Sequence, residues 1–134
     1  MFDDAVLIYA YTRNQAIEDG VLVDVTETAK EAGYRVPVAI TNSVYVDCVQ
    51  WTEEDQEKTY QDESGRLWDV LFMSGIKCRA LTRTGIHGDS FTFQFRCIPR
   101  EGTSTEPELV TLVCRMGGGD HGEPVMTIMF PHED

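Results

Sequence analysis

The chain has 134 residues, of which 42% are hydrophobic and 25% are charged, and this predicts one globular domain over residues 1–134 rather than a disordered chain. It carries 23 acidic against 11 basic residues, a formal net charge of −12, which argues against direct binding to nucleic acid or to anionic membranes. The same charge either attracts basic surfaces, such as those of nucleic-acid-binding proteins, or only keeps the protein soluble.

Capping signals predict two short helices in the first third of the chain. Residues 12–15 have the spacing of a capping box, and Gly20 is placed to end the helix that this box opens. Residues 21–23 are expected to be extended. Asp24 is the expected N-cap of a second helix over residues 27–32, which a glycine follows.

The middle of the chain also favours helices. Residues 41–51 combine helical spacing of apolar side chains with β-branched residues, and we interpret them as a helix. Thr52, followed by carboxylates, predicts the start of an exposed helix that runs through Tyr60. A turn at residues 64–65 is then expected to precede a buried helix that begins near Arg66.

The last third alternates as strands do. Residues 91–97 place Phe and Cys side chains at every second position, and residues 109–116 and 125–130 show related patterns. The connections, 99–107 and 117–124, are short enough for an antiparallel meander. The sequence therefore predicts an α+β domain, with short N-terminal and central helices packed on a C-terminal antiparallel sheet of three or more strands.

The cysteines show no metal-binding pattern. Cys48, Cys78, Cys97 and Cys114 lie 30, 19 and 17 residues apart, with no C-x-x-C pair. We therefore expect reduced, at least partly buried thiols, with no metal and no cofactor. Residues 1–4 lack the basic and apolar features of a signal peptide, which leads us to expect a cytoplasmic protein without a membrane segment.

A glycine-rich loop and three histidines are the candidates for catalysis. Residues 117–122 read Gly-Gly-Gly-Asp-His-Gly, but they lack the Lys and Ser or Thr of a phosphate-binding loop, so a flexible hairpin loop is the favoured interpretation. His87, His121 and His132 do not have the spacing of a helical metal site. A small enzyme that acts on a nucleotide or a protein through the loops around His87 and His121 remains an alternative.

An acidic cluster is the candidate for partner binding. It consists of Glu53, Glu54, Asp55, Glu57, Asp62 and Glu63. On a short helix and the following loop, these carboxylates can lie several ångströms apart, as phosphates do along a nucleic-acid strand. Trp51 and Tyr60 flank the cluster and would serve either as aromatic anchors or as the buried face of the helix. The alternative is a solvated helix whose first turn favours acids.

Four stretches resemble a known family. They are IYAYTR (8–13), QAIEDGVLVDV (15–25), RLWDVL (66–71) and EPVMTIMFP (123–131). In this order they resemble a family of small, uncharacterised, acidic proteins encoded on plasmids and phages of proteobacteria. The resemblance implies no activity and no site residues. It does imply an accessory protein of a mobile element, a class that often counters host defence.

These observations lead to one favoured hypothesis. The chain is expected to be a non-enzymatic inhibitor of the anti-CRISPR or antirestriction type, encoded by a mobile element. Its acidic segment, residues 53–63, would bind a basic nucleic-acid-binding protein of a host defence system and block its nucleic-acid-binding surface. The alternatives are the small enzyme described above and a housekeeping factor of plasmid maintenance.

Overall fold

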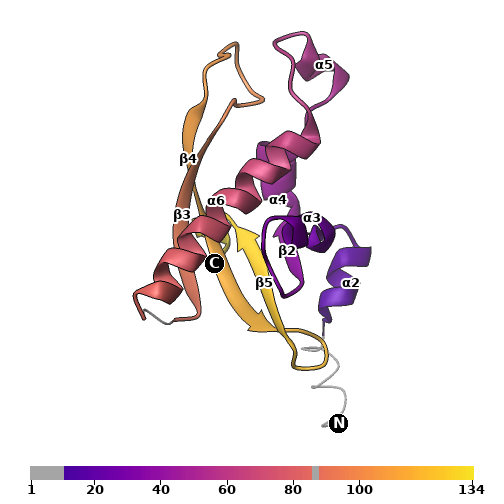
Figure 1. Ribbon diagram of the computed structural model, residues 1–134. Coiled ribbons are helices and arrows are strands. Elements are labelled where there is room, and N and C mark those ends of the chain that lie inside the picture. The colour runs from indigo at the N-terminus through magenta and orange to yellow at the C-terminus, as the bar shows by residue number, and fades with distance from the viewer. Residues whose placement is uncertain (1–10, 86–87) are drawn as a thin grey trace.

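The computed structural model describes residues 11–85 and 88–134, which fold into a five-stranded mixed sheet with helices (Figure 1). The strands are β1 (Leu22–Asp24), β2 (Val38–Thr41), β3 (Ser90–Cys97), β4 (Glu108–Gly118) and β5 (Pro124–Met129). The helices are α2 (Arg13–Glu18), α3 (Thr26–Glu31), α4 (Asn42–Val44), the π-helical turn η1 (Tyr45–Val49), α5 (Glu53–Gln56), α6 (Glu63–Arg83) and the 3-10 turn η2 (Pro131–Glu133). Within the described ranges, no helix is both long and apolar enough to cross a membrane.

The sheet has the order β1-β2-β5-β4-β3. Strands β3, β4 and β5 form the predicted antiparallel meander, with Phe93 opposite Leu112 and Cys114 opposite Ile128. The expectation of a C-terminal antiparallel sheet holds for these three strands, but the whole sheet is mixed, because β2 pairs with β5 in parallel and β1 joins β2 at the edge. The N-terminal half therefore contributes two of the five strands and not only helices.

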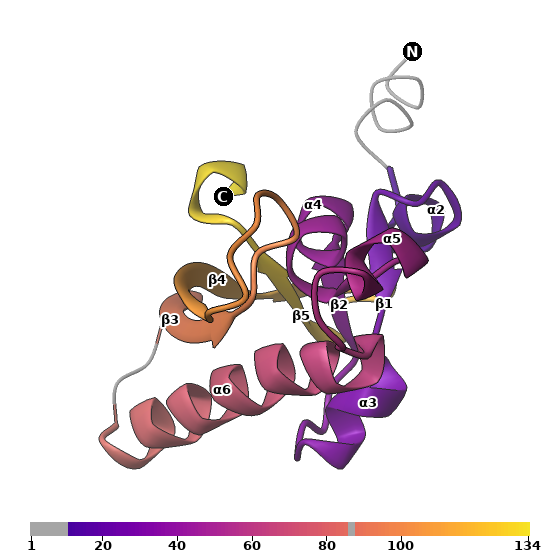
Figure 2. The same ribbon diagram turned by 90° about the horizontal axis from the view of Figure 1, so that it is seen from above.

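The core lies between the inner face of the sheet and α6. On β3, Phe93 and Phe95 are buried on this face, as the alternation predicts, and Gln94 between them is exposed. Val70 and Leu71 of α6 are fully buried. Figure 2 shows α6 and α3 side by side along one side of the sheet. One layer of helix thus covers the apolar side of the meander.

Helix α6 begins earlier than the sequence suggested. Asp62 is its N-cap and accepts a hydrogen bond from the backbone N–H of Gly65 at 2.6 Å. The predicted turn at residues 64–65 is therefore wrong, because this cap holds both residues in the first turn of the helix. Farther along, the Ser74 hydroxyl bonds with the Tyr34 hydroxyl at 2.6 Å in the core.

The short helices follow their capping signals with small shifts. Thr12 and Gln15 form the predicted capping box of α2. Helix α3 starts at Thr26 instead, and Asp24 supports that start by accepting hydrogen bonds from the backbone N–H and the hydroxyl of this threonine. Gly33 follows α3 with a φ of +103°, a conformation that favours glycine.

The segment before α5 closes one end of the core. Of the predicted helix over residues 41–51, residues 42–49 are helical, but α4 passes into the π-helical turn η1, which buries Cys48 and Val49. Helix α5 is shorter than expected, since it ends at Gln56 rather than near Tyr60. The chain then runs through an irregular stretch into the cap of α6.

Candidate functional site

The acidic cluster lies at one end of the molecule, beside the β3–β4 loop (Figure 1). We call residues 52–63 and 98–107 together the acidic end. The two segments are joined by direct contacts: the Lys58 ammonium donates to the backbone carbonyls of Pro99 and Glu101. The acidic end is therefore one surface built from two distant parts of the chain.

Arg100 makes the second connection between these segments. Its guanidinium forms an ion pair with Asp55, with 2.8 Å between Nε and Oδ2. The same group donates to the Val46 carbonyl at 2.9 Å and to the Gln50 side-chain oxygen at 3.1 Å. These contacts direct the positive charge of Arg100 toward the protein interior.

Arg66 lies buried next to the acidic end and bonds to a backbone carbonyl there. This residue is only 3% exposed, and its guanidinium donates to the carbonyls of Val49 at 3.1 Å and Ile98 at 3.0 Å. It also lies 4.5 Å from the centre of the Trp51 ring, a cation–π contact. Burial lowers the pKa of Arg66, but an arginine remains charged in proteins. A cation is thus enclosed at the base of an acidic surface.

The cations of the acidic end are paired within the protein, whereas most of its carboxylates are exposed. Lys58 and Arg100, the two cations within its residues, make the contacts to backbone carbonyls and to Asp55 described above. The exposed carboxylates are Glu53, Glu54, Glu57, Asp62, Glu101 and Glu106. The outer surface of this end therefore presents negative charge, while the compensating positive charge is held against backbone carbonyls and Asp55.

The six predicted contact residues do not share one role. Glu53, Glu54 and Glu57 are exposed on or next to α5, whereas Asp62 is exposed but caps α6. Glu63 is half-buried, where it accepts hydrogen bonds from the Tyr45 hydroxyl and the Trp51 backbone N–H. Glu63 therefore holds η1 against the start of α6, in addition to any contact with a partner.

Asp55 also has a structural role. Its carboxylate accepts from the backbone N–H of Thr52 at 2.8 Å, which completes the capping box of α5. Burial alone would raise the pKa of Asp55, but the hydrogen bonds from Thr52 and the charge of Arg100 outweigh it and lower the pKa. The flanking aromatics also differ: Trp51 is 5% exposed and Tyr60 is 78% exposed, so Tyr60 is the aromatic side chain available at this surface.

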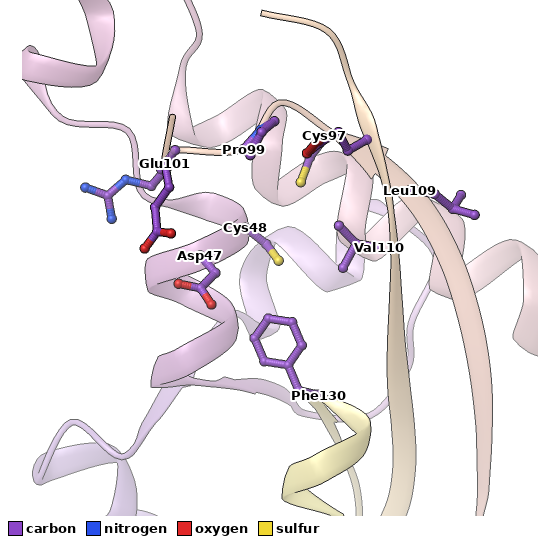
Figure 3. A pocket seen from close by; sticks show the side chains of 10 residues that line it. Asp47, Cys48, Cys97, Pro99, Glu101, Leu109, Val110 and Phe130 are labelled. Atoms are coloured by element: carbon purple, nitrogen blue, oxygen red, sulfur yellow. The ribbon is translucent and has the colours of Figure 1, made fainter. Parts of the chain in front are cut away.

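A cavity of about 300 Å³ opens beneath the β3–β4 loop (Figure 3). Its lining includes Cys48 of η1, Cys97 of β3, Val110 of β4, Asp47 and Phe130. The expectation of buried or partly buried cysteines is confirmed, because three are buried and Cys78 is half-buried. No sequence pattern indicates this cavity, since the residues that line it come from separate elements.

The two thiols in this cavity affect each other. Interaction with the Cys48 thiol lowers the pKa of Cys97, and the positive charge of Arg66 acts in the same direction against the effect of burial. The pKa of Cys48 is raised, first by its interaction with Cys97 and then by burial. The two pKa directions make Cys97 the more acidic thiol of the pair.

The glycine-rich loop lies at the opposite end of the sheet. Asp120 accepts hydrogen bonds from the backbone N–H groups of Arg13 at 2.7 Å and Asn14 at 3.1 Å, which attaches the start of α2. The Arg13 guanidinium also donates to the Thr127 hydroxyl of β5 at 2.7 Å. These contacts agree with a hairpin loop that serves the fold.

The histidines give no assembled site among the described residues. His121 is exposed, His132 stacks on Phe130 with 5.5 Å between ring centres, and His87 lies outside the described residues. Within residues 11–85 and 88–134, no group of three or more His, Cys, Asp or Glu residues is placed to hold a metal ion. The enzymatic alternative around His87 and His121 stays a prediction.

Comparison with known proteins identifies a family. A family model described as a family of unknown function, DUF6573, matches residues 1–134. No curated protein matches the chain. No solved structure matches it either. The comparisons therefore assign no activity.

Proposed function

We propose a function for this chain, which belongs to the family of unknown function DUF6573: it is a non-enzymatic protein that binds, through its acidic end, the basic nucleic-acid-binding surface of another protein. The observation that carries this proposal is that Lys58 and Arg100 are engaged by backbone carbonyls and Asp55, whereas six carboxylates of the same end are exposed. Because its cations are paired within the protein, this end presents a negative surface to a partner.

The resemblance to small proteins of plasmids and phages adds the class of partner. A mobile element benefits from a protein that occupies the nucleic-acid channel of a host defence complex, and such a complex works in the cytoplasm. We therefore propose inhibition of the anti-CRISPR or antirestriction type. Electrostatic attraction would speed the encounter, and Tyr60 is placed to add an apolar contact within the same surface.

A charge-reversal experiment tests this proposal. Replacing Glu53, Glu54 and Glu57 by Lys changes the net charge from −12 to −6. A matched control replaces Glu18, Glu27 and Glu31 by Lys, which changes the net charge by the same amount. These three residues are exposed on α2 and α3. Both variants and the wild type are used to capture proteins from a host lysate over a range of salt concentrations, and the captured protein is identified by mass spectrometry.

The expected result is selective. The wild type and the control capture the same nucleic-acid-binding protein, added DNA displaces it, and binding weakens as salt rises. The acidic-end variant, shown to be folded by circular dichroism, loses this partner. Equal binding by all three proteins, equal loss in both variants, or a complex that DNA does not displace would each contradict the proposal.

A further inference from the structure

Two cysteines, Cys48 and Cys97, line the cavity and have no role in the proposed partner binding. Cys48 lies on η1 and Cys97 is the last residue of β3, and Figure 3 shows the sulfur atoms of both residues at the same cavity. They are free, and their exposed fractions are 2% and 9%. A π-helical turn such as η1 is rare and occurs often at functional sites.

The charges around this pair favour a thiolate at one sulfur. The positive charge of Arg66 lowers the pKa of both thiols and so favours their ionisation. Asp69 and Glu108 act in the opposite direction on Cys97. Cys97 lines the cavity of about 300 Å³, and the thiolate is the nucleophilic form of cysteine.

We propose that Cys48 and Cys97 form a dithiol site that reduces a hydroperoxide, with Cys97 as the attacking thiolate and Cys48 as the resolving thiol. The Cys97 sulfur attacks the terminal peroxide oxygen, the O–O bond breaks, and the alkoxide or hydroxide that leaves takes a proton from solvent. Cys97 becomes a sulfenic acid. The Cys48 sulfur then attacks the Cys97 sulfur, the S–O bond breaks, and hydroxide leaves with the Cys48 proton as water. Two thiols and one hydroperoxide thus yield a disulfide, an alcohol or water, and one water.

The other two cysteines lack this arrangement. Cys114 is 1% exposed and lies against the Met126 sulfur at 3.6 Å, and burial raises its pKa to about 12. Cys78 is half-buried on α6, away from the cavity lining. They provide internal controls for selective oxidation.

The oxidised form has a structural consequence. The disulfide would join η1 to the end of β3 and close a loop between residues 48 and 97, which restricts the unfolded chain. We expect a higher melting temperature after oxidation, reversed by a dithiol reductant. The proposal does not depend on partner binding, so the two can fail separately.

The first experiment uses the reduced wild-type chain. Hydrogen peroxide is added, remaining thiols are blocked, and the peptides are mapped by mass spectrometry. The expected product is an intramolecular Cys48–Cys97 disulfide, with Cys78 and Cys114 still reduced. Earlier oxidation of Cys78 or Cys114, or no linked peptide at a peroxide concentration that oxidises free cysteine, would overturn the proposal.

Variants then separate the roles of the two thiols. Cys48→Ser should stop at the sulfenic acid of Cys97, which dimedone traps, whereas Cys97→Ser should leave Cys48 reduced. The reverse pattern would overturn the assignment. Because the mapping uses the wild type, a variant that fails to fold leaves that test intact.

A surface variant tests the electrostatic argument. Glu108 lies at the cavity and disfavours the thiolate, so Glu108→Gln should speed oxidation about twofold at neutral pH. Glu106→Gln removes a neighbouring exposed carboxylate outside the cavity lining and should leave the rate unchanged. An equal rate for the wild type and Glu108→Gln, or an equal increase in both variants, would contradict the role given to the cavity charges.

Discussion

The two ends of the sheet are connected to the N-terminal half of the chain in different ways. At the acidic end, the buried guanidinium of Arg66 donates to carbonyls of η1 and of the segment after β3. At the glycine-rich end, the exposed carboxylate of Asp120 accepts from the first turn of α2. A buried donor leaves unpaired carbonyls when it is removed, whereas water can replace an exposed acceptor. Stability should therefore depend far more on the first connection.

Deletion of a core side chain sets the scale for this comparison. Phe93 is 3% exposed between α6 and the sheet, so Phe93→Ala should lower the free energy of unfolding by about 3 to 5 kcal/mol. Urea denaturation followed by circular dichroism measures the loss. A stability close to that of the wild type would show that the Phe93 side chain is not packed in the core.

Removal of the buried guanidinium of Arg66 should cause the second largest loss in the free energy of unfolding. Arg66→Met keeps an apolar stem but leaves the carbonyls of Val49 and Ile98 without their donor. We expect a loss of about 2 to 4 kcal/mol in the free energy of unfolding, since each buried unpaired group costs about 1 to 3 kcal/mol. The same denaturation experiment checks it. A loss no larger than that of Asp120→Ala would remove the difference between the two ends.

The ion pair at the acidic end should show a pH dependence. Asp55→Ala is expected to cost about 1 kcal/mol at neutral pH through the lost cap and ion pair. The pKa of Asp55 is lower in the folded chain than its usual 3.8, so protonation favours the unfolded state. The contribution of the Asp55 carboxylate to the free energy of unfolding is complete above pH 3.8 and is lost as the pH falls through the lowered pKa.

Melting temperatures of the wild type and Asp55→Ala, measured from neutral to acidic pH, check this prediction. The difference between them should shrink below pH 3.8. Glu54→Ala removes an exposed carboxylate from the same helix and serves as the control. A difference for Asp55→Ala that stays constant down to acidic pH would contradict the ion pair.

The glycine-rich end should give the smallest effects. Asp120→Ala removes an acceptor from the start of α2 and should cost about 0.5 to 1 kcal/mol. His121→Ala changes the exposed neighbouring residue and should stay within about 0.5 kcal/mol of the wild type. Thermal denaturation compares the pair, and a larger loss for His121→Ala would indicate an interaction that the fold does not explain.

The strands differ in how well their sequence predicts them. Strand β3 has one buried and one exposed face, and its alternation is visible in the sequence. Strand β2 was missed because Val38, Ala39 and Ile40 are all at most 1% exposed, so the strand reads as a short apolar run. The parallel pairing of β2 with β5 also leaves no local signal, since the partners are far apart in the chain.

The candidate site was predictable only as a set of charges. Acidic composition marked residues 53–63, but the structural role of Asp55 depends on Arg100, 45 positions later. Cys48 and Cys97 are as distant in sequence, and a spacing rule for metal or redox motifs does not find them. Tertiary contacts, rather than local pattern, decide which carboxylates are available and which thiols meet.

The position of β5 has a consequence for how the chain folds. This strand follows all the others in the sequence but lies in the middle of the sheet, between β2 and β4. Until Pro124–Met129 is in place, the β1–β2 pair and the β3–β4 hairpin have no neighbour in common. Pairing between strands that are far apart in the chain slows folding, and the two half-sheets have unpaired edges until β5 is added. Ribosome-bound chains that lack β5 are therefore expected to need protection from aggregation.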